Sequence, residues 1–186
     1  MLSVNFDPYP VLDSPRLTLR RPLLSDAADI FEMRSDPEVM RYIPRPLAKN
    51  HEDVHALLKM LDDFVEKNER INWAIEWKET GQVIGLIGFV NIHPEHFRGE
   101  VGYSLTRAWH RKGIMREALA TVVNYGFDTM KFHSIEAILD AENNASAKLL
   151  EDAGFTKEAY FREDFFHDGA FRNSIHYGLL QSDYQK

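Results

Sequence analysis

The chain has 186 residues, contains no cysteine and carries a formal net charge of -7 at pH 7. The lack of cysteine excludes disulfides, thiolate metal sites and a cysteine nucleophile, and the negative charge argues against general binding to nucleic acid, which needs a cationic face. Hydrophobic residues are 44% and charged residues 27% of the chain, which is ordinary for a globular protein, and the length favours a single domain over residues 1–186.

The N-terminal third carries strand and helix signals in turn. Alternating apolar and polar residues predict a strand over residues 16–20. A helix capped by Ser25 or Asp26 is expected to run to Arg34. A loop rich in proline then separates it from a second helix over residues 51–67.

A hairpin and a series of alternating elements are expected next. Residues 73–77 alternate between large apolar and polar side chains, which predicts a strand with one wet face, and residues 83–90 form a strand that is apolar on both faces. The remaining expected elements are a helix over about residues 113–130, a strand over 134–139, a helix that begins at Asn143, and strands over about 156–164 and 171–180 joined by an Asp168-Gly169 turn.

Residues 99–118 are the most informative stretch of the sequence. A strand leads through a turn that contains Gly113 into a helix, and Arg111, Lys112 and Arg116 flank that turn. The first backbone N–H groups of a helix have no intrahelical partner, so together with the helix dipole and these cations they form a site for an anion. The sequence therefore predicts a phosphorylated ligand at this junction.

Residues 110–115 resemble the Q/R-x-x-G-x-G/A pyrophosphate loop of the GNAT N-acetyltransferases, in the branch that includes the ribosomal-protein N-terminal acetyltransferases. Two residues depart from the pattern: His110 stands where Gln or Arg is usual, and Met115 where a small residue is usual. Further along, Asn143-x-x-Ser146, followed by a Gly-Phe pair, resembles the family's second signature. The resemblance extends over nearly the whole chain. It implies an α/β fold with one mixed, mostly antiparallel sheet of about seven strands, splayed after its fourth strand and flanked by about four helices.

The resemblance also implies acetyl-CoA as a co-substrate and no metal. In the family, the loop binds the pyrophosphate, the end of the preceding strand lines the pantetheine arm, and the helix-capping asparagine hydrogen-bonds the pantetheine amides. The residues expected to bind the cofactor are Tyr103, Leu105, Thr106, His110, Arg111, Lys112, Gly113, Ile114, Met115, Arg116 and Asn143. Arg107 is a further candidate for the phosphates.

Glu100 and Ser146 are the expected catalytic residues. Glu100 lies ten residues before His110. This position resembles that of the glutamate base on the fourth strand of several family members, and a carboxylate can take the proton of an attacking amine. The alternative is an edge glutamate that faces solvent or pairs with Arg98. In the family, the residue at the Ser146 position lies near the thioester sulfur. Because a serine hydroxyl is a poor acid, we assign it as a hydrogen-bond donor, with simple helix capping by Asn143 and Ser146 as the alternative.

Two further groups complete the expected chemistry. Backbone N–H groups of residues 103–105 lie where the strand loses its partner, so they are expected to stabilise the oxyanion. Tyr160 and Tyr177 are alternative donors to the leaving thiolate.

The resemblance implies direct transfer in a ternary complex, without a covalent enzyme intermediate, and a protein N-terminal amine as the leading acceptor. A small amine, a polyamine or an antibiotic is the alternative acceptor, because acceptor contacts come from variable loops. Asn173 stands where the family's closing hairpin usually has aspartate, which weakens any transfer of acceptor identity. A catalytically silent acetyl-CoA sensor is a further alternative. We expect a cytoplasmic monomer or homodimer without a membrane partner, since no apolar run reaches spanning length and no signal peptide is evident.

A zinc hydrolase is the remote alternative from another class of function. His51-Glu52-x-x-His55 satisfies H-E-x-x-H, which on a helix places two imidazoles for zinc beside a glutamate base. The extended pattern would need glycine and histidine at positions 58 and 61, where this chain has leucine. The apolar face of the helix also implies that His51 and Glu52 lie at its exposed start.

Overall fold

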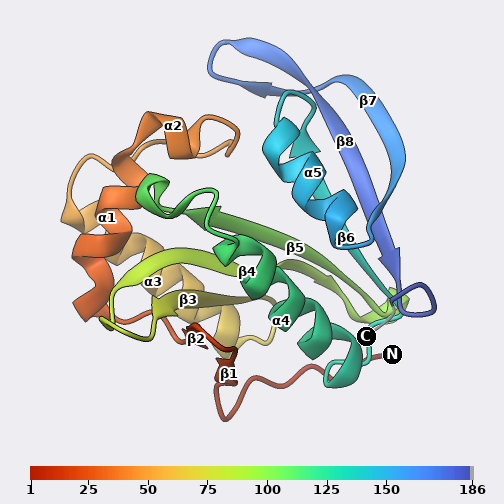
Figure 1. The fold of residues 1–186 in the computed structure, drawn as a ribbon, viewed down its shortest axis with the longest axis horizontal. Helices are drawn as coiled ribbons and strands as arrows, with labels where there is room; N and C mark the ends of the chain where they lie inside the picture. The colour runs from red at the N-terminus through yellow and green to blue at the C-terminus, as the bar shows by residue number, and fades with distance from the viewer. Residues whose placement is uncertain (185–186) are drawn as a thin grey trace.

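The computed structural model describes residues 1–184, which form a sheet with helices on both faces (Figure 1). The strands are β1 (Leu12–Asp13), β2 (Leu17–Arg20), β3 (Ile71–Trp77), β4 (Val83–His93), β5 (Arg98–Leu105), β6 (Ser134–Asp140), β7 (Thr156–His167) and β8 (Ala170–Leu180). The helices are α1 (Ala27–Ser35), α2 (Pro37–Met40), α3 (His51–Glu66), α4 (Ile114–Asp128) and α5 (Asn144–Asp152), with short 3-10 turns at Leu24–Asp26, Pro94–His96 and Arg107–Trp109.

Within residues 1–184 the eight strands lie in the order β1-β2-β3-β4-β5-β6-β8-β7. All neighbouring strands are antiparallel except β5 and β6, which run parallel. The expected α/β class and mixed, mostly antiparallel sheet are thereby confirmed. The expected numbers of strands and helices are each exceeded by one: β1 has two residues and α2 has four, too few for a periodic pattern to reveal.

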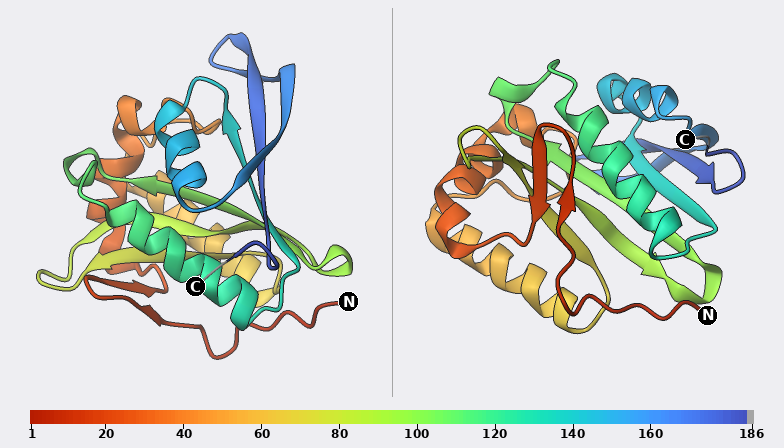
Figure 2. Two further views of the ribbon diagram at one scale, coloured as in Figure 1. Left: turned by 45° about the vertical axis from the view of Figure 1, so that its right-hand side comes forward. Right: turned by 60° about the horizontal axis from the view of Figure 1, so that its bottom comes forward.

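Helices cover both faces of the first half of the sheet (Figure 2). On one face, α4 packs Leu119 into the same cluster as Trp73 and Ile75 of β3. On the other, α1 packs Ile30 into a second cluster with Ala74. Trp73, Ala74 and Ile75 are all fully buried. The expectation that β3 has one wet face is therefore wrong, because a second helix layer covers the face that was expected to be exposed.

The second half of the sheet has one open face. β6 pairs with β8 along its whole length, and Ile135 and Ala137 of β6 join the core cluster that includes Leu150 of α5. Ile138, the next residue of β6, points to the opposite face because successive strand residues alternate. Its side chain is 43% exposed, so this face of the sheet is not covered there. Within the described residues, no helix is both long enough and apolar enough to cross a membrane.

The hairpin of β7 and β8 extends beyond the body of the protein (Figure 1). Its turn is Asp168-Gly169, as predicted, and the two residues have φ of 49° and 75°. Two successive residues with positive φ are typical of the tight turn that matches the twist of a hairpin.

Candidate active site

β5 and β6 separate soon after they meet. Parallel pairing joins them only at residues 98–100 and 134–136; beyond these residues β5 follows β4 and β6 follows β8. Residues 101–105 of β5 and residues 137–140 of β6 therefore diverge, and we call the region between them the splay (Figure 2). Along the splay, the edge of β5 that faces β6 has no strand partner, so its backbone N–H groups can donate to a ligand.

The turn that connects β5 to α4 contains two left-handed residues. Arg111 and Gly113 have φ of 60° and 72°. Gly113 is the N-cap of α4 and supplies no side-chain cap to the first N–H groups of the helix. Arg107, Arg111 and Lys112 are exposed around these groups. Helix donors, helix dipole and cations together suit an anion such as a phosphate.

Side chains at the start of the chain support this turn. Arg16 Nη1 donates to the Lys112 carbonyl over 3.0 Å. Glu117, in the first turn of α4, accepts from Arg16 Nε over 2.7 Å and from the Ser14 hydroxyl over 2.7 Å. The Arg16 guanidinium also lies 5.9 Å from the centre of a Trp77 ring. These contacts were not predicted, because no local sequence pattern connects residues so far apart.

Glu100 lies on β5 immediately before the splay. Its side chain is half-buried, and its Oε2 accepts a hydrogen bond from Asn91 Nδ2 on β4. Arg98 pairs with Glu136 of β6. Arg98 thus pairs with a different glutamate, whereas the half-buried Glu100 keeps part of its side chain in contact with solvent. The role of Glu100 as base stays a prediction.

Glu100 and Tyr103 point to opposite faces of β5, because they are three residues apart in a strand. Val101 and Leu105, on the same side as Tyr103, are buried in the cluster that includes Ile114 of α4. Glu100 is therefore on the face away from α4.

The Tyr103 and Ser146 side chains meet across the splay. Their hydroxyl oxygens are 2.7 Å apart, which joins β5 to the first turn of α5. Burial raises the pKa of Tyr103 to about 12, although the hydrogen bond with Ser146 acts in the opposite direction. Tyr103 is therefore protonated at neutral pH. The sequence indicated only the backbone of Tyr103, and this side-chain contact was not predicted.

Asn143 is the N-cap of α5. Its side-chain oxygen accepts from the backbone N–H of Ser146 over 3.1 Å. The capping role is thus confirmed for Asn143, and its amide NH₂ group is not used by that hydrogen bond. Binding of pantetheine through this NH₂ group stays a prediction.

The His110 side chain contacts the end of β5. Its Nε2 lies 2.9 Å from the Leu105 carbonyl oxygen, so the imidazole at this unusual position bonds to the strand end. Leu105 is buried in the core, and the Thr106 backbone N–H donates to the Ile84 carbonyl over 2.8 Å. The Thr106 N–H is therefore held by β4, and because N–H groups alternate in direction along a strand, those of Val101, Tyr103 and Leu105 are the ones that face the splay.

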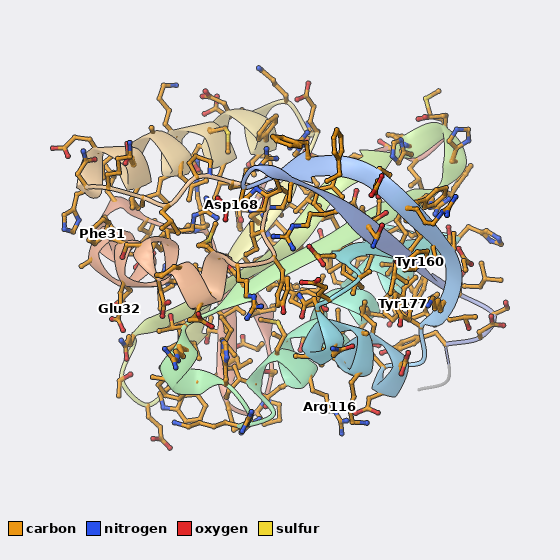
Figure 3. All side chains as sticks on the ribbon, turned by 90° about the horizontal axis from the view of Figure 1, so that it is seen from above. Phe31, Glu32, Arg116, Tyr160, Asp168 and Tyr177 are labelled. Atoms are coloured by element: carbon orange, nitrogen blue, oxygen red, sulfur yellow. The ribbon has the colours of Figure 1, made fainter. Side chains whose placement is uncertain are left out.

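The first turn of α4 carries three more of the expected cofactor residues. Ile114 is fully buried, and Met115 packs partly buried against the same core cluster. Met115 thus fills apolar space where the family pattern has a small residue. Arg116 is exposed and pairs with Asp152 of α5 over 2.6 Å (Figure 3).

Tyr160 and Tyr177, the alternative donors, have other surroundings (Figure 3). The buried Tyr177 hydroxyl donates to Glu151 at the far end of α5 over 2.8 Å. Tyr160 is exposed on β7, where Lys157 Nζ lies 5.5 Å from the centre of its ring. Ser146 is therefore bonded to a different tyrosine, Tyr103.

Asn173 has a structural role in the hairpin. Its side-chain oxygen accepts from the backbone N–H of Glu163 over 2.8 Å, and Glu163 has a φ of 52°. The pairing of β7 with β8 shifts register between Phe161 and Phe165. The side-chain oxygen of Asn173 thus satisfies a backbone donor in this irregular stretch. An aspartate oxygen could accept the same hydrogen bond, so the contact does not explain the departure from aspartate.

The residues of the H-E-x-x-H pattern lie on the first turns of α3. His51, Glu52 and His55 are exposed. The His51 ring stacks on Phe31 of α1, with ring centres 4.9 Å apart and an angle of 28° between the planes (Figure 3). Within residues 1–184, no group of three or more histidine, aspartate or glutamate side chains is placed to hold a metal ion.

Comparison with known proteins gives consistent results. The family model described as Acetyltransferase (GNAT) domain matches residues 16–156. The chain is 32% identical over 176 residues to the uncharacterized N-acetyltransferase YoaA of Bacillus subtilis, covering 93% of this chain and 98% of that protein. A crystal structure of a GNAT-family acetyltransferase from Bacillus anthracis superposes with a TM-score of 0.83 and 26% identity, covering 93% of this chain and 99% of that one.

Two relatives with named acceptors are more distant. The Escherichia coli [ribosomal protein uS5]-alanine N-acetyltransferase is 29% identical over 130 residues, covering 69% of this chain and 67% of that protein. The spermidine N(1)-acetyltransferase of Escherichia coli is 25% identical over 165 residues, covering 88% and 86%. The two relatives differ in the kind of amine that they acetylate.

Proposed function

This chain belongs to the GNAT acetyltransferase family, and from that premise we propose that it transfers the acetyl group of acetyl-CoA to a primary amine, with a protein N-terminal amine as the leading acceptor. The observation that carries the proposal is the splay itself. Glu100 lies at its start, the Tyr103–Ser146 contact crosses it, and the Gly113 turn follows the end of β5.

The residues around the splay fit acetyl-CoA by their chemistry. The uncapped start of α4 and the exposed Arg107 and Arg111 offer hydrogen-bond donors and positive charge to phosphates. The NH₂ group of Asn143 offers a donor to an amide carbonyl, as in pantetheine. The free edge of β5 adds donors for a second amide or for the acetyl carbonyl oxygen.

Each chemical task then has a residue. When bound, acetyl-CoA supplies the acetyl group as a thioester. Glu100 takes the proton of the attacking amine as the C–N bond forms, and N–H groups of β5 stabilise the negative charge that develops on the carbonyl oxygen. The C–S bond breaks and the thiolate leaves with the electron pair, while the Ser146 hydroxyl donates a hydrogen bond to it. No covalent bond to the protein is formed.

A protein N-terminal amine is favoured because such amines have a pKa of about 7.7 to 8.0 and are substantially neutral near pH 8. The relative that acetylates a ribosomal-protein alanine supports this acceptor. The spermidine-acetylating relative supports the second candidate, a small-molecule amine. Glu136, the register partner of Glu100 in β6, is already paired with Arg98, so of these two carboxylates it is Glu100 that can attract a cationic acceptor of either kind. The cytoplasmic location and the monomeric or dimeric state stay predictions.

A thiol-release assay tests the proposal. The protein is incubated with acetyl-CoA and, in separate reactions, N-terminal peptides of differing first residue, spermidine and simple amines, with the Glu100→Gln variant as the control. We expect release with N-terminal peptides that falls in the variant. Release with spermidine alone would move the acceptor to the second candidate. Calorimetric binding of acetyl-CoA without thiol release for any amine would support the silent sensor instead.

A further inference from the structure

The contact between Tyr103 and Ser146 links two elements that otherwise diverge. Tyr103 lies on the β5 side of the splay and Ser146 lies at the start of α5, with hydroxyl oxygens 2.7 Å apart. The two side chains come from residues 43 positions apart in the sequence. The contact therefore depends on the fold and not on local capping.

Both residues are held in place independently of this contact. The Ser146 backbone N–H is fixed by the Asn143 side chain. Tyr103 packs partly buried against the core cluster, and its neighbours Val101 and Leu105 on the same face are themselves part of it. The packing around Tyr103 and the cap on Ser146 therefore hold the two hydroxyls within hydrogen-bond distance of each other.

The direction of the hydrogen bond matters for chemistry. A serine hydroxyl has one hydrogen to donate and two lone pairs that accept. Tyr103 keeps its proton at neutral pH, because burial raises its pKa to about 12, and a buried O–H without an acceptor is costly. Ser146 is the acceptor within reach of that O–H. When Tyr103 donates, the hydrogen of Ser146 is left to point at another group.

We propose that Tyr103 is a positioning residue that donates its hydroxyl proton to Ser146, so that the Ser146 hydroxyl directs its own hydrogen to the sulfur of the leaving thiolate. This inference rests on the proposed acetyl transfer and gives Tyr103 a side-chain role in it. Tyr103 stabilises the thiolate only through Ser146. Removal of its hydroxyl therefore acts on the thiolate step and leaves binding of acetyl-CoA nearly unchanged.

The test compares Tyr103→Phe, Ser146→Ala and the double variant, with Tyr177→Phe as the matched control. Tyr177 is also a buried tyrosine bonded to α5, but through Glu151, so its variant reports the general effect of losing such a hydroxyl. Thermal unfolding checks that each variant is folded. We expect kcat to fall about tenfold in Tyr103→Phe, with KM for acetyl-CoA within about twofold of wild type.

A second measurement is independent of the acceptor. CoA is bound to each variant, and the ultraviolet absorbance of its thiolate is followed as a function of pH. A hydrogen bond to the thiolate favours the ionised form, so the pKa of bound CoA should rise in Tyr103→Phe and in Ser146→Ala, and should stay at the wild-type value in Tyr177→Phe. The double variant should be no worse than Ser146→Ala alone, because the two hydroxyls act as one unit.

The outcomes separate this inference from the proposed function. Wild-type kcat and an unchanged thiolate pKa in folded Tyr103→Phe would overturn the role of Tyr103 while acetyl transfer stands. Additive losses in the double variant would also overturn it, because they show that Tyr103 acts without Ser146. Failure of the wild-type protein to bind CoA would overturn both.

Discussion

Arg16 and Glu117, which lie 101 residues apart in the sequence, are joined by two hydrogen bonds. Arg16 Nε donates to Glu117 Oε2 over 2.7 Å, and the Arg16 backbone N–H donates to Glu117 Oε1 over 2.8 Å. Because Arg16 also donates to the Lys112 carbonyl, it holds residues on both sides of Gly113. A residue that belongs to no motif thus determines how firmly the turn before α4 is held.

Replacement of Arg16 by Ala is expected to raise KM for acetyl-CoA about fivefold to tenfold and to change kcat much less. The turn loses two side-chain hydrogen bonds, each worth about 1 kcal/mol, while the groups at the reacting atoms stay in place. Steady-state kinetics and calorimetry with CoA measure the two effects. Arg21→Ala is the control, because Arg21 pairs with Asp62 of α3. Equal KM in the two variants would contradict the role of Arg16.

The strength of the contact between Arg16 and Glu117 depends on pH, because Glu117 is titratable. Burial alone would raise the pKa of Glu117, but hydrogen bonds from Ser14 and Arg16 and the charge of Arg16 outweigh burial and lower that pKa. A carboxyl with a lowered pKa in the folded state stabilises the protein above its unfolded pKa of about 4.3, and this stabilisation is lost as the pH falls through the folded value.

The free energy of unfolding of Glu117→Gln is therefore expected to lie below that of wild type at pH 7, with a difference that shrinks below about pH 4. Urea unfolding at a series of pH values measures it. The exposed pair of Lys59 and Asp63 supplies the control variant, Asp63→Asn, which should change stability little. A Glu117→Gln difference that stays constant from pH 7 to pH 3 would show that the charge of Glu117 is not involved.

Elements with strong local patterns were predicted well. α3 was expected over residues 51–67 and is His51–Glu66; the helix expected over about 113–130 is Ile114–Asp128. Both have a clear apolar face, and Asn143 was recognised as a cap from the residues that follow it. The Asp168-Gly169 turn was equally clear, because few residue pairs accept two positive φ values.

Features that depend on long-range contacts could not be predicted. The pairing of β4 with β5 shifts register between Phe89 and Asn91, which brings Asn91 opposite Glu100. No signal in either strand shows this irregularity, so the partner of Glu100 was missed. The burial of both faces of β3 was missed for the same reason. Whether a face of a strand is covered by a helix depends on residues that are distant in the sequence.

Glu100→Gln tests the proposed base. The substitution keeps the size of the side chain and removes its ability to take a proton, so turnover is expected to fall about 100-fold. Calorimetry should find acetyl-CoA affinity nearly unchanged. Asn91→Ala, which removes only the hydrogen bond to Glu100, should have a smaller effect of about tenfold or less. Turnover at the wild-type level in Glu100→Gln would assign proton removal to water or to another residue.

Gly113→Ala tests the turn before α4, and Gly81→Ala is its matched control. Gly113 and Gly81 have nearly equal φ, 72° and 71°, so an added Cβ strains the backbone by about 1 kcal/mol in each case. A Cβ at Gly113 would meet only Arg16 Nη2, at 3.6 Å, and one at Gly81 would meet nothing within 4 Å. Steric conflict within the protein is therefore small at both positions, and the two variants should lose similar stability in urea unfolding.

Affinity for acetyl-CoA should nevertheless separate the two variants. The strain at Gly113 acts on the residue that orients the first N–H groups of α4, so KM for acetyl-CoA should rise about tenfold. Gly81 lies in the turn between β3 and β4, away from that helix start, and its variant should keep the wild-type KM. Equal loss of stability with an unchanged KM in both variants would mean that the phosphates bind elsewhere, because Gly113 differs from Gly81 mainly in its place before α4.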